Sequence, residues 1–320
     1  MSKPRVIVTR KIPDDVETLL RRHFTVALNP ADEPFSTERL IKAMQAADGL
    51  LCTVTDKISD EVIKAGGARK TQIIANFGVG YSNIDTAAAK AAEVVVTNTP
   101  DVLTDATADI ALSLMLNVTR RTWEMENMLR QGKWSGFSLV KDLGTGLQGK
   151  VLGIIGMGRI GEAVAKRAEA FGMEVIFYNR SRKKSKDVAA VQVDSVDTLL
   201  AQADVVSLHC PGGDENRHLI NAERIEKMKP TAFIINTARG EVIDERALTE
   251  ALAAGRIAGA GLDVFENEPH VTDRLRRLDN VCLYPHIGSA TIETRTAMGM
   301  LAAENLIAHF GSGEYPSRVV

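Results

Sequence analysis

The stretch GIIGMGRIG (residues 153–161) indicates the fold of the chain, because its glycines separate two segments of different periodicity. Gly156, Gly158 and Gly161 have the spacing G-x-G-x-x-G, between an apolar strand-like run and an amphipathic helix-like run. In such a turn the first glycine permits the tight bend, the second lets the backbone approach a pyrophosphate, and the third lets the helix pack on the strand. The N-terminus of the helix also attracts phosphate. The stretch predicts a Rossmann unit that binds a dinucleotide.

The motif begins almost halfway along a chain of 320 residues, which is longer than one hydrophobic core usually serves. Short β-branched runs alternate with longer runs of helical periodicity from end to end, and this pattern is typical of parallel α/β sheets. The expected strands are 5–9, 24–28, 49–53, 72–77 and 94–98 before the motif, and 150–156, 173–179, 204–210, 231–237, 257–264 and 281–285 from it onward.

Two helical segments suggest how these strands divide into domains. Residues 102–132 have apolar residues at helical spacing without proline, which predicts one long helix at a domain boundary. A last helix, 290–310, is expected to pack on the first domain. We therefore expect an α/β protein with two doubly wound parallel sheets and a cleft between them. A flavodoxin-like substrate domain would comprise 1–99 and 287–320, and a Rossmann cofactor domain would comprise 100–286.

Composition narrows the class of protein. The hydrophobic fraction of 45% is ordinary, and a formal charge of -2 gives no support for non-specific binding to nucleic acid or to acidic membranes. Three cysteines, Cys52, Cys210 and Cys282, are too few for a disulfide framework or a zinc cluster. With no signal peptide and no apolar run of spanning length, a cytoplasmic protein is expected. The histidines without metal-ligand spacing, expected to be surface or packing residues, are His23, His209, His218, His270 and His309.

Three polar side chains follow three successive expected strands: Arg239 in NTARGEVID, Glu268 in GLDVFENEP and His286 in LYPHIGSAT. Open α/β sheets bind ligands at the carboxyl ends of their strands. An arginine presents a fork to a carboxylate, and a histidine can protonate a nascent alkoxide. A neighbouring carboxylate would orient the imidazole and raise its pKa. Each residue alone also fits a surface turn, but together they suit hydride transfer to a 2-oxo acid.

The residues after the second strand of the predicted Rossmann unit bear on the cofactor. An NAD site has an acidic residue there, which binds the ribose hydroxyls and would repel a 2′-phosphate. Here Asn179 is followed by Arg180 and Ser181, a cation and a hydroxyl, and residues 182–184 are also basic. The sequence predicts that NADPH is preferred and that NADH is also accepted. The alternative is a solvated basic loop.

These motifs give the chain a resemblance to the D-isomer-specific 2-hydroxyacid dehydrogenases. GMGRIG, NTARGEVIDERAL, GLDVFENEP and PHIGSAT match the signatures of that family in order and at familiar spacing, and NFGVGYSNID (76–85) is similar to its substrate loop. The resemblance covers essentially the whole chain. It is strongest to the glyoxylate and hydroxypyruvate reductase branch, including NTPDVLTDATAD (98–109). It implies a homodimer joined through the cofactor domains.

The resemblance also implies roles for individual residues. Arg239 would bind the substrate carboxylate and polarise the 2-oxo group, Glu268 would pair with the imidazole, and His286 would act as the general acid. Asp263 would receive the nicotinamide carboxamide. The other expected substrate contacts are Val54, the backbone of Val79 and Gly80, and Trp134 reaching from the partner subunit. The expected cofactor contacts are Gly156, Gly158, Arg159, Ile160, Gly161, Asn179, Arg180, Ser181, Cys210, Pro211, Thr237, Ala238, Asp263 and Gly288.

The expected reaction is reduction of a small 2-oxo acid, glyoxylate or hydroxypyruvate, to the D-hydroxy acid. A D-lactate or D-3-phosphoglycerate dehydrogenase remains an alternative. Formate oxidation fits less well, because formate dehydrogenases of this fold have Gln in the place of Glu268. A non-catalytic NAD(P)-sensing protein similar to the corepressors of this fold is the alternative from another class.

Overall fold

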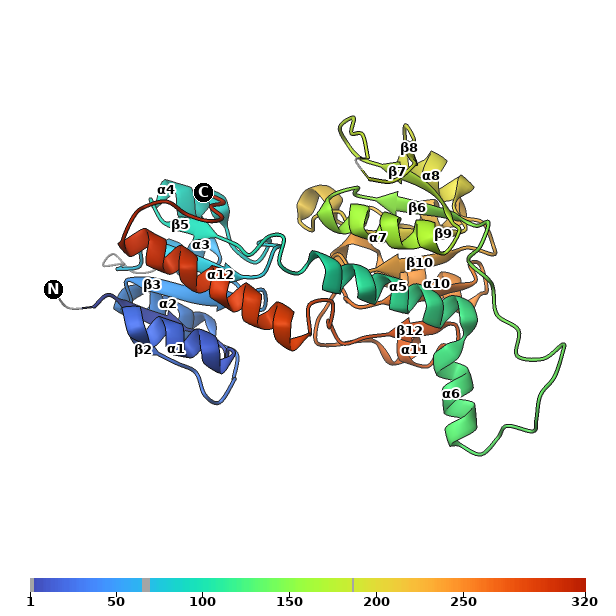
Figure 1. Ribbon diagram of the computed structural model, residues 1–320, viewed down its shortest axis with the longest axis horizontal. Helices are drawn as coiled ribbons and strands as arrows, with labels where there is room; N and C mark the ends of the chain where they lie inside the picture. Colours follow the sequence, from blue (N-terminus) through green and yellow to red (C-terminus); the bar gives the residue numbers. More distant parts are fainter. Residues whose placement is uncertain (1–2, 65–69, 186) are drawn as a thin grey trace. The chain divides into compact units, whose positions relative to one another are not determined.

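The computed structural model describes residues 3–64, 70–185 and 187–320, and the chain forms two compact units (Figure 1). The first unit comprises Met1–Leu103 and Ser289–Val320, and the second comprises Thr104–Gly288. The predicted domain boundaries lie after residues 99 and 286. The assignment of substrate and cofactor to the two units stays a prediction.

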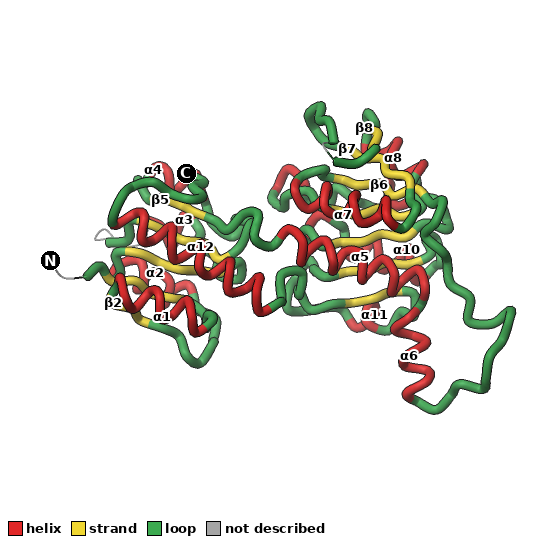
Figure 2. The backbone as a smooth tube through the Cα atoms, in the orientation of Figure 1, coloured by secondary structure: helices red, strands yellow, loops and turns green. Residues whose placement is uncertain are grey.

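The first unit is built on a five-stranded parallel sheet. Its strands are β1 (Arg5–Val8), β2 (Thr25–Ala27), β3 (Gly49–Thr53), β4 (Ile73–Phe77) and β5 (Val95–Thr97). Their spatial order is β2-β1-β3-β4-β5, with every neighbouring pair parallel. This is the flavodoxin-like order of a doubly wound sheet. Figure 2 shows these strands with helices on both faces.

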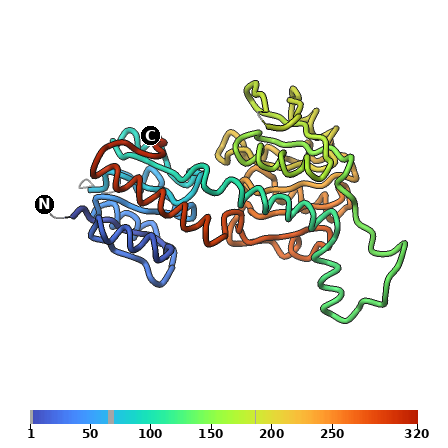
Figure 3. The backbone as a smooth tube through the Cα atoms, in the orientation of Figure 1, coloured from blue at the N-terminus to red at the C-terminus, as the bar shows by residue number. Residues whose placement is uncertain are grey.

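Helices from both ends of the chain cover one face of this sheet. The last helix, α12 (Ile292–Phe310), packs against β4, β3 and α1 (Asp14–His23), so a helix from the first part of the chain (blue) and one from the last part (red) lie side by side in Figure 3. The other face is covered by α2 (Thr37–Ala46), α3 (Asp60–Lys64) and α4 (Thr86–Ala91), whose apolar side chains form one buried cluster with the strands.

The second unit contains a seven-stranded parallel sheet. Its strands are β6 (Val151–Ile155), β7 (Glu174–Tyr178), β8 (Ala190–Gln192), β9 (Val205–Leu208), β10 (Phe233–Asn236), β11 (Gly259–Leu262) and β12 (Val281–Leu283). The spatial order is β12-β11-β10-β9-β6-β7-β8. Counted from β6 as the first strand, this is the Rossmann order 3-2-1-4-5-6 with one strand added. The predicted fold class, with two doubly wound parallel sheets, is confirmed.

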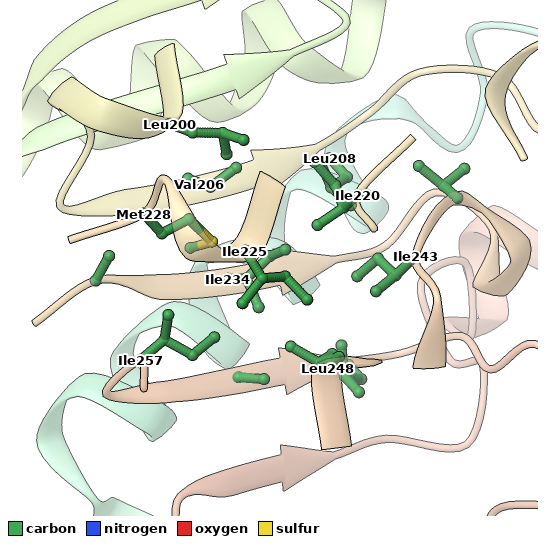
Figure 4. Close-up of a cluster of buried hydrophobic side chains, with 14 of the residues drawn as sticks. Leu200, Val206, Leu208, Ile220, Ile225, Met228, Ile234, Ile243, Leu248 and Ile257 are labelled. Carbon is green, nitrogen blue, oxygen red and sulfur yellow. The ribbon is translucent and has the colours of Figure 1, made fainter. Parts of the chain in front are cut away.

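Both faces of the second sheet are buried, as parallel strands require. On one face α5 (Thr104–Arg120) and α7 (Arg159–Ala170) pack against each other and the strands. On the other face the buried cluster of Figure 4 joins the strands to α8 (Val196–Gln202), α9 (Ala222–Glu226) and α10 (Glu245–Ala253). The short helices η1 (Asp214–Asn216), η2 (Gly240–Val242) and α11 (Asp273–Arg276) lie in the loops.

The prediction of one long helix over 102–132 is wrong. The structure has two helices, α5 and α6 (Thr122–Arg130), with Arg121 between them. Arg121 has φ +56°, a left-handed conformation that cannot continue a right-handed helix. The returning chain also bonds to the last turn of α5, because Thr145 N donates to Thr119 O at 2.7 Å. No side chain of α6 is buried.

Strand β8 was also not predicted from the sequence. This strand is only three residues long, lies at the edge of the sheet and pairs with β7 alone. Its central residue, Val191, is exposed, so the segment lacks the apolar run that marks the inner strands.

Two of the cysteines, Cys52 and Cys282, are buried, and Cys210 is partly buried. Burial raises the pKa of Cys210 and of Cys282 to about 11. His209 lies against Ser207 Oγ at 2.8 Å, and burial lowers its pKa to about 3, so it packs as a neutral ring. None of the helices in the described ranges has the length and apolar character needed to cross a bilayer.

Candidate active site

The second unit gathers most of the predicted site residues at one edge of its sheet. The glycine motif follows β6, Cys210 and Pro211 follow β9, and Arg239 follows β10. Asp263 follows β11, and His286 follows β12. Because all seven strands are parallel, these carboxyl ends share one edge.

The glycine motif lies where the order of the strands reverses, between β6 and β9. Gly156 has φ +96°, and a Cβ atom there would lie 2.6 Å from the backbone nitrogen of Cys210. Only glycine permits this turn so close to the end of β9. Gly158, which precedes α7, has φ -87°, and a Cβ atom there would meet nothing within 4 Å. The packing of the protein therefore does not require glycine at 158, and the space before the helix N-terminus is open.

His286 and Glu268 form a hydrogen-bonded pair. His286 Nδ1 lies 2.7 Å from Glu268 Oε2, while Glu268 Oε1 accepts a hydrogen bond from Phe265 N at 3.0 Å. Burial alone would raise the pKa of the Glu268 carboxyl, but the hydrogen bond and charge of His286, with smaller contributions from Phe265 N and Arg239, lower it below its usual value. The two side chains keep 36% and 33% of their surface exposed, so a small ligand can reach the pair.

Asp263 holds the backbone that carries His286. Its carbonyl accepts from His286 N at 2.9 Å, and its carboxylate accepts from Ile287 N at 2.7 Å and from Gly288 N at 2.8 Å. These bonds stabilise the left-handed backbone of His286, φ +52°, which costs about 1–2 kcal/mol in a residue with a side chain. Burial raises the pKa of Asp263 against the effect of these N–H groups. Each carboxylate oxygen keeps a second lone pair that can accept a hydrogen bond from the nicotinamide carboxamide. That contact stays a prediction.

The guanidinium of Arg239 is largely shielded from water. Burial lowers the pKa of its guanidinium, although the charges of Glu241 and Glu268 partly offset this. Nη1 donates to Ala238 O at 2.6 Å. Among the residues that the structure describes, no carboxylate lies within ion-pair distance of Arg239. A buried guanidinium in this state favours an anionic ligand.

Two neighbours fix the loop that carries Arg239. The Asn236 side chain accepts from Ala238 N at 3.0 Å and donates to Arg239 O at 2.9 Å. A Cβ atom at Gly240 would lie 1.9 Å from the carbonyl carbon of Phe265, so this glycine lets the loop contact the segment that leads to Glu268. The guanidinium and the imidazole–carboxylate pair are thus carried by loops in direct contact.

In the first unit, the predicted substrate loop follows β4, and three of its carbonyl groups are held by side chains of asparagine. Asn76 Nδ2 donates to Gly78 O at 3.2 Å and to Gly80 O at 2.9 Å, and Asn98 Nδ2 donates to Val79 O at 2.9 Å. In a trans peptide the N–H points opposite to the preceding carbonyl. The N–H groups of Val79 and Gly80 therefore point away from these asparagines, and in the described part of the chain neither has a hydrogen-bond partner.

Two further predicted substrate contacts lie in different surroundings. Val54 packs against the same loop, because a Cβ atom at Gly78 would lie 2.4 Å from Val54 Cγ1. Trp134 lies after α6 in the second unit, and 56% of its surface is exposed. Trp123, by contrast, is half-buried against the cluster beneath α5 and α7.

The loop after β7 is attached to the glycine motif. Asn179 Oδ1 accepts from Met157 N at 2.7 Å. Lys183 Nζ lies 3.2 Å from Glu162 Oε1 and also donates to Met157 O. This ammonium group is therefore engaged by residues of the same unit. Arg180 is exposed and pairs with Glu215 of η1. The next residue, Ser181, is also exposed.

The asparagines that hold two loops of the candidate site were not predicted from the sequence. Asn76 and Asn236 stand at or next to the last position of a strand, and Asn98 directly follows one. An amide side chain at a strand end can both donate to and accept from the loop that follows. That position, within the quoted motifs, is the signal that could have indicated their roles.

The open space at Gly158 gives a matched pair of variants with Gly156. Gly156→Ala should lower the free energy of unfolding by about 2–4 kcal/mol, because the methyl group would overlap the backbone of Cys210 and strain the turn. Gly158→Ala should cost less than about 1 kcal/mol, the difference between glycine and alanine at an N-cap. Chemical denaturation measures both. Equal losses would contradict the contrast between a crowded and an open glycine.

Comparison with known proteins gives the family. A family model described as D-isomer specific 2-hydroxyacid dehydrogenase, NAD binding domain, matches residues 112–288. The glyoxylate reductase of Thermococcus litoralis is 46% identical, covering 99% of this chain and 97% of its own. The NADPH-dependent glyoxylate/hydroxypyruvate reductase of Sinorhizobium meliloti, solved with NADP and malonate, is 36% identical with a TM-score of 0.90, covering 100% of this chain and 97% of its own. A glyoxylate reductase from Paecilomyes thermophila is 34% identical with a TM-score of 0.89, covering 100% of this chain and 99% of its own. The chain belongs to the D-isomer-specific 2-hydroxyacid dehydrogenase family and is an oxidoreductase.

Proposed function

We propose that this protein reduces a small 2-oxo acid, glyoxylate or hydroxypyruvate, to the D-2-hydroxy acid with NADPH. The observation that carries the proposal is the guanidinium of Arg239, which is largely shielded from water and has no ion-pair partner in the described part of the chain. Its loop contacts the segment that carries Glu268. A 2-oxo acid supplies the anion that such a guanidinium binds, and a carbonyl that a protonated imidazole can hydrogen-bond. The names of the relatives, glyoxylate reductase and NADPH-dependent glyoxylate/hydroxypyruvate reductase, point to the same substrates.

The substrate carboxylate would bind the backbone N–H groups of Val79 and Gly80. Their orientation is set by Asn76 and Asn98, so no reorganisation is needed when the anion arrives. In the second unit, Arg239 would bind the carboxylate of a 2-oxo acid and polarise its 2-oxo oxygen. Val54 would line the site beside the loop.

His286 would deliver the proton. NADPH, when bound, supplies the hydride that adds to the carbonyl carbon, and the carbonyl oxygen then needs one proton to become the hydroxyl. Protonated His286 would give this proton from Nε2, because Nδ1 is engaged with Glu268. The lowered pKa of Glu268 keeps its carboxylate charged, and that charge stabilises the imidazolium before transfer.

The cofactor would lie along the carboxyl edge of the second sheet. Its pyrophosphate would occupy the open space at Gly158, against Gly156, Gly161 and the backbone of Arg159 and Ile160 at the start of α7. The adenosine ribose would meet Asn179, and the 2′-phosphate would meet Arg180 and Ser181. The residues proposed along the rest of the cofactor are Cys210, Pro211, Thr237, Ala238, Asp263 and Gly288.

The exposed apolar segment around α6 would join two copies of the chain. Its exposed apolar side chains are Leu129, Trp134, Phe137, Leu139, Val140 and Leu143. Large exposed apolar patches are typical of interaction sites. We propose a homodimer with this segment at its interface, and Trp134 reaching the substrate site of the partner subunit. A location in the cytosol stays a prediction.

Replacing Arg239 tests the carboxylate site. Arg239→Lys should lower kcat/KM for glyoxylate roughly 10- to 100-fold, because an ammonium group cannot reproduce the planar fork on a carboxylate. Arg217→Lys, at an arginine that is 53% exposed, is the matched control and should leave kcat/KM unchanged. Steady-state kinetics with both variants make the measurement. Wild-type kcat/KM in Arg239→Lys would remove Arg239 from the substrate site.

Replacing the imidazole tests the proton donor. His286→Ala should lower kcat about 10²- to 10⁴-fold, the usual loss for a positioned acid, while the affinity for NADPH stays nearly unchanged. His270→Ala, at an exposed histidine, should keep full activity. A single-turnover assay and a cofactor titration separate the two effects. Full kcat in His286→Ala would contradict the assignment.

The partner of the imidazole should control the pH profile. Reduction needs a proton on the imidazole, so kcat/KM should fall at high pH. In Glu268→Gln the anion that stabilises this proton is gone, and the fall should move to lower pH by about one unit. The pH dependence of kcat/KM measures the shift. An unmoved profile would exclude Glu268 from the mechanism.

Cofactor preference should depend on the loop after β7. Arg180→Ala combined with Asn179→Asp should move the ratio of kcat/KM from NADPH toward NADH at least tenfold, because it removes a cation and restores an anion that repels the 2′-phosphate. Arg182→Ala gauges the general effect of one charge in the same loop and should change the ratio much less. A wild-type preference for NADH, or an unmoved ratio, would mean that the loop is only a surface turn.

The proposed dimer can be tested by its mass in solution. Phe137→Ser combined with Leu139→Ser should convert the dimer to a monomer, because both side chains are at least 80% exposed in one chain. Phe171→Ser, at an exposed aromatic residue after α7, should leave the mass unchanged. Light scattering after size-exclusion chromatography makes the measurement. A monomeric wild type would contradict the proposal.

A further inference from the structure

Gln192 lies at the end of β8, the edge strand that the sequence analysis missed, and its amide holds the loop that follows β7. Nε2 donates to Asn179 O at 3.3 Å and to Ser181 O at 3.0 Å, while Oε1 accepts from Lys183 N at 2.9 Å. One side chain thus satisfies three backbone groups within five consecutive residues, 179–183.

The backbone of β8 gives this amide a fixed base. Gln192 is paired with Phe177 of β7 in the parallel register, and the next residue, Val193, donates from its N to Phe177 O at 2.9 Å. Gln192 is half-buried, whereas its neighbour Val191 is 65% exposed. The main chain of Gln192 is therefore held by the sheet, and its side chain bonds to the loop.

The two ends of the same loop are fastened to the glycine motif and to α7. Asn179 Oδ1 accepts from Met157 N, and Lys183 pairs with Glu162. Between these two anchors, Arg180 and Ser181 have exposed side chains. The bonds of Gln192 to the carbonyls of Asn179 and Ser181 lie on either side of Arg180, so they set the direction in which its side chain leaves the backbone.

Arg180 already binds an anion in this structure, the carboxylate of Glu215. Both side chains of this pair are largely exposed, 65% and 76%, so the pair is weak and can exchange for another anion. None of the bonds made by Gln192 involves Glu215. The loop can therefore keep its conformation when the partner of Arg180 changes.

We propose that Gln192 is a positioning residue for recognition of the 2′-phosphate of NADPH. Its amide holds residues 179–183 in the conformation in which Arg180 and Ser181 bind the phosphate, and this order lowers the entropy lost on binding. The inference rests on the proposed preference for NADPH. Gln192 would select between NADPH and NADH through the loop, without touching the cofactor itself.

The test uses two fragments of the cofactor that differ only in the 2′-phosphate, adenosine 2′,5′-bisphosphate and adenosine 5′-monophosphate. Calorimetric titration of the full chain gives the two dissociation constants. In Gln192→Met, which keeps the length of the side chain and loses both polar groups, the bisphosphate should bind roughly 5- to 20-fold more weakly. The monophosphate should bind within about twofold of wild type.

Val191→Met, on the same strand, is the matched control and should leave both constants unchanged. Gln192→Asn keeps an amide but shortens the side chain, and it should show the same selective loss. Turnover with saturating NADH should stay at the wild-type level in every variant. A role in stability alone would weaken both fragments equally or neither, and it would leave their ratio unmoved.

The results distinguish the role of Gln192 from the preference for NADPH. A wild-type ratio far from one, retained in both Gln192 variants, would overturn the inference and leave the NADPH preference intact. A wild-type ratio near one would overturn the NADPH preference itself. Loss of the ratio in the Gln192 variants, with Val191→Met at the wild-type ratio, is the result expected.

Discussion

The candidate site depends on a guanidinium that is largely shielded from water and has no carboxylate within ion-pair distance among the described residues. Transferring a charge into protein costs several kcal/mol unless it is paired, and the lowered pKa of Arg239 reflects this cost. The residues around Arg239 must therefore hold its loop in place. Asn236 fixes the turn from both sides, and the absence of a side chain at Gly240 allows the loop to contact the segment beyond β11. An anionic ligand would supply the missing partner.

A second constraint is the orientation of the loops that carry the candidate ligand-binding groups. The loops at the carboxyl edge are held by hydrogen bonds from buried or half-buried side chains to the backbone. Asp263 holds the segment after His286, and Gln192 holds the segment that contains Arg180. In the first unit Asn98 holds the loop at Val79. The groups proposed to meet ligands are thus held by hydrogen bonds within the protein, so little reorganisation accompanies binding.

Much of this arrangement could be predicted from the sequence, because parallel strands buried on both faces are continuous apolar runs and their ends are marked by polar motifs. Arg239, Glu268 and His286 were named because each follows such a run. The left-handed backbone of Arg121 leaves no signal in composition, so the break between α5 and α6 was missed. The edge strand β8 is too short and too polar for its periodicity to show. The bonds of Asn76, Asn98 and Gln192 depend on where loops return in space, which periodicity along the chain does not describe.

The most direct test of the account is the specificity of turnover. Steady-state kcat/KM would be measured for glyoxylate, hydroxypyruvate, pyruvate and phosphohydroxypyruvate, each with NADPH and with NADH. We predict that glyoxylate and hydroxypyruvate with NADPH give the highest values, and that the product of hydroxypyruvate is the D isomer. Higher kcat/KM for pyruvate or for the phosphorylated substrate would contradict the proposed substrates. No turnover with any pair would contradict the reaction itself and favour a protein that only binds the dinucleotide.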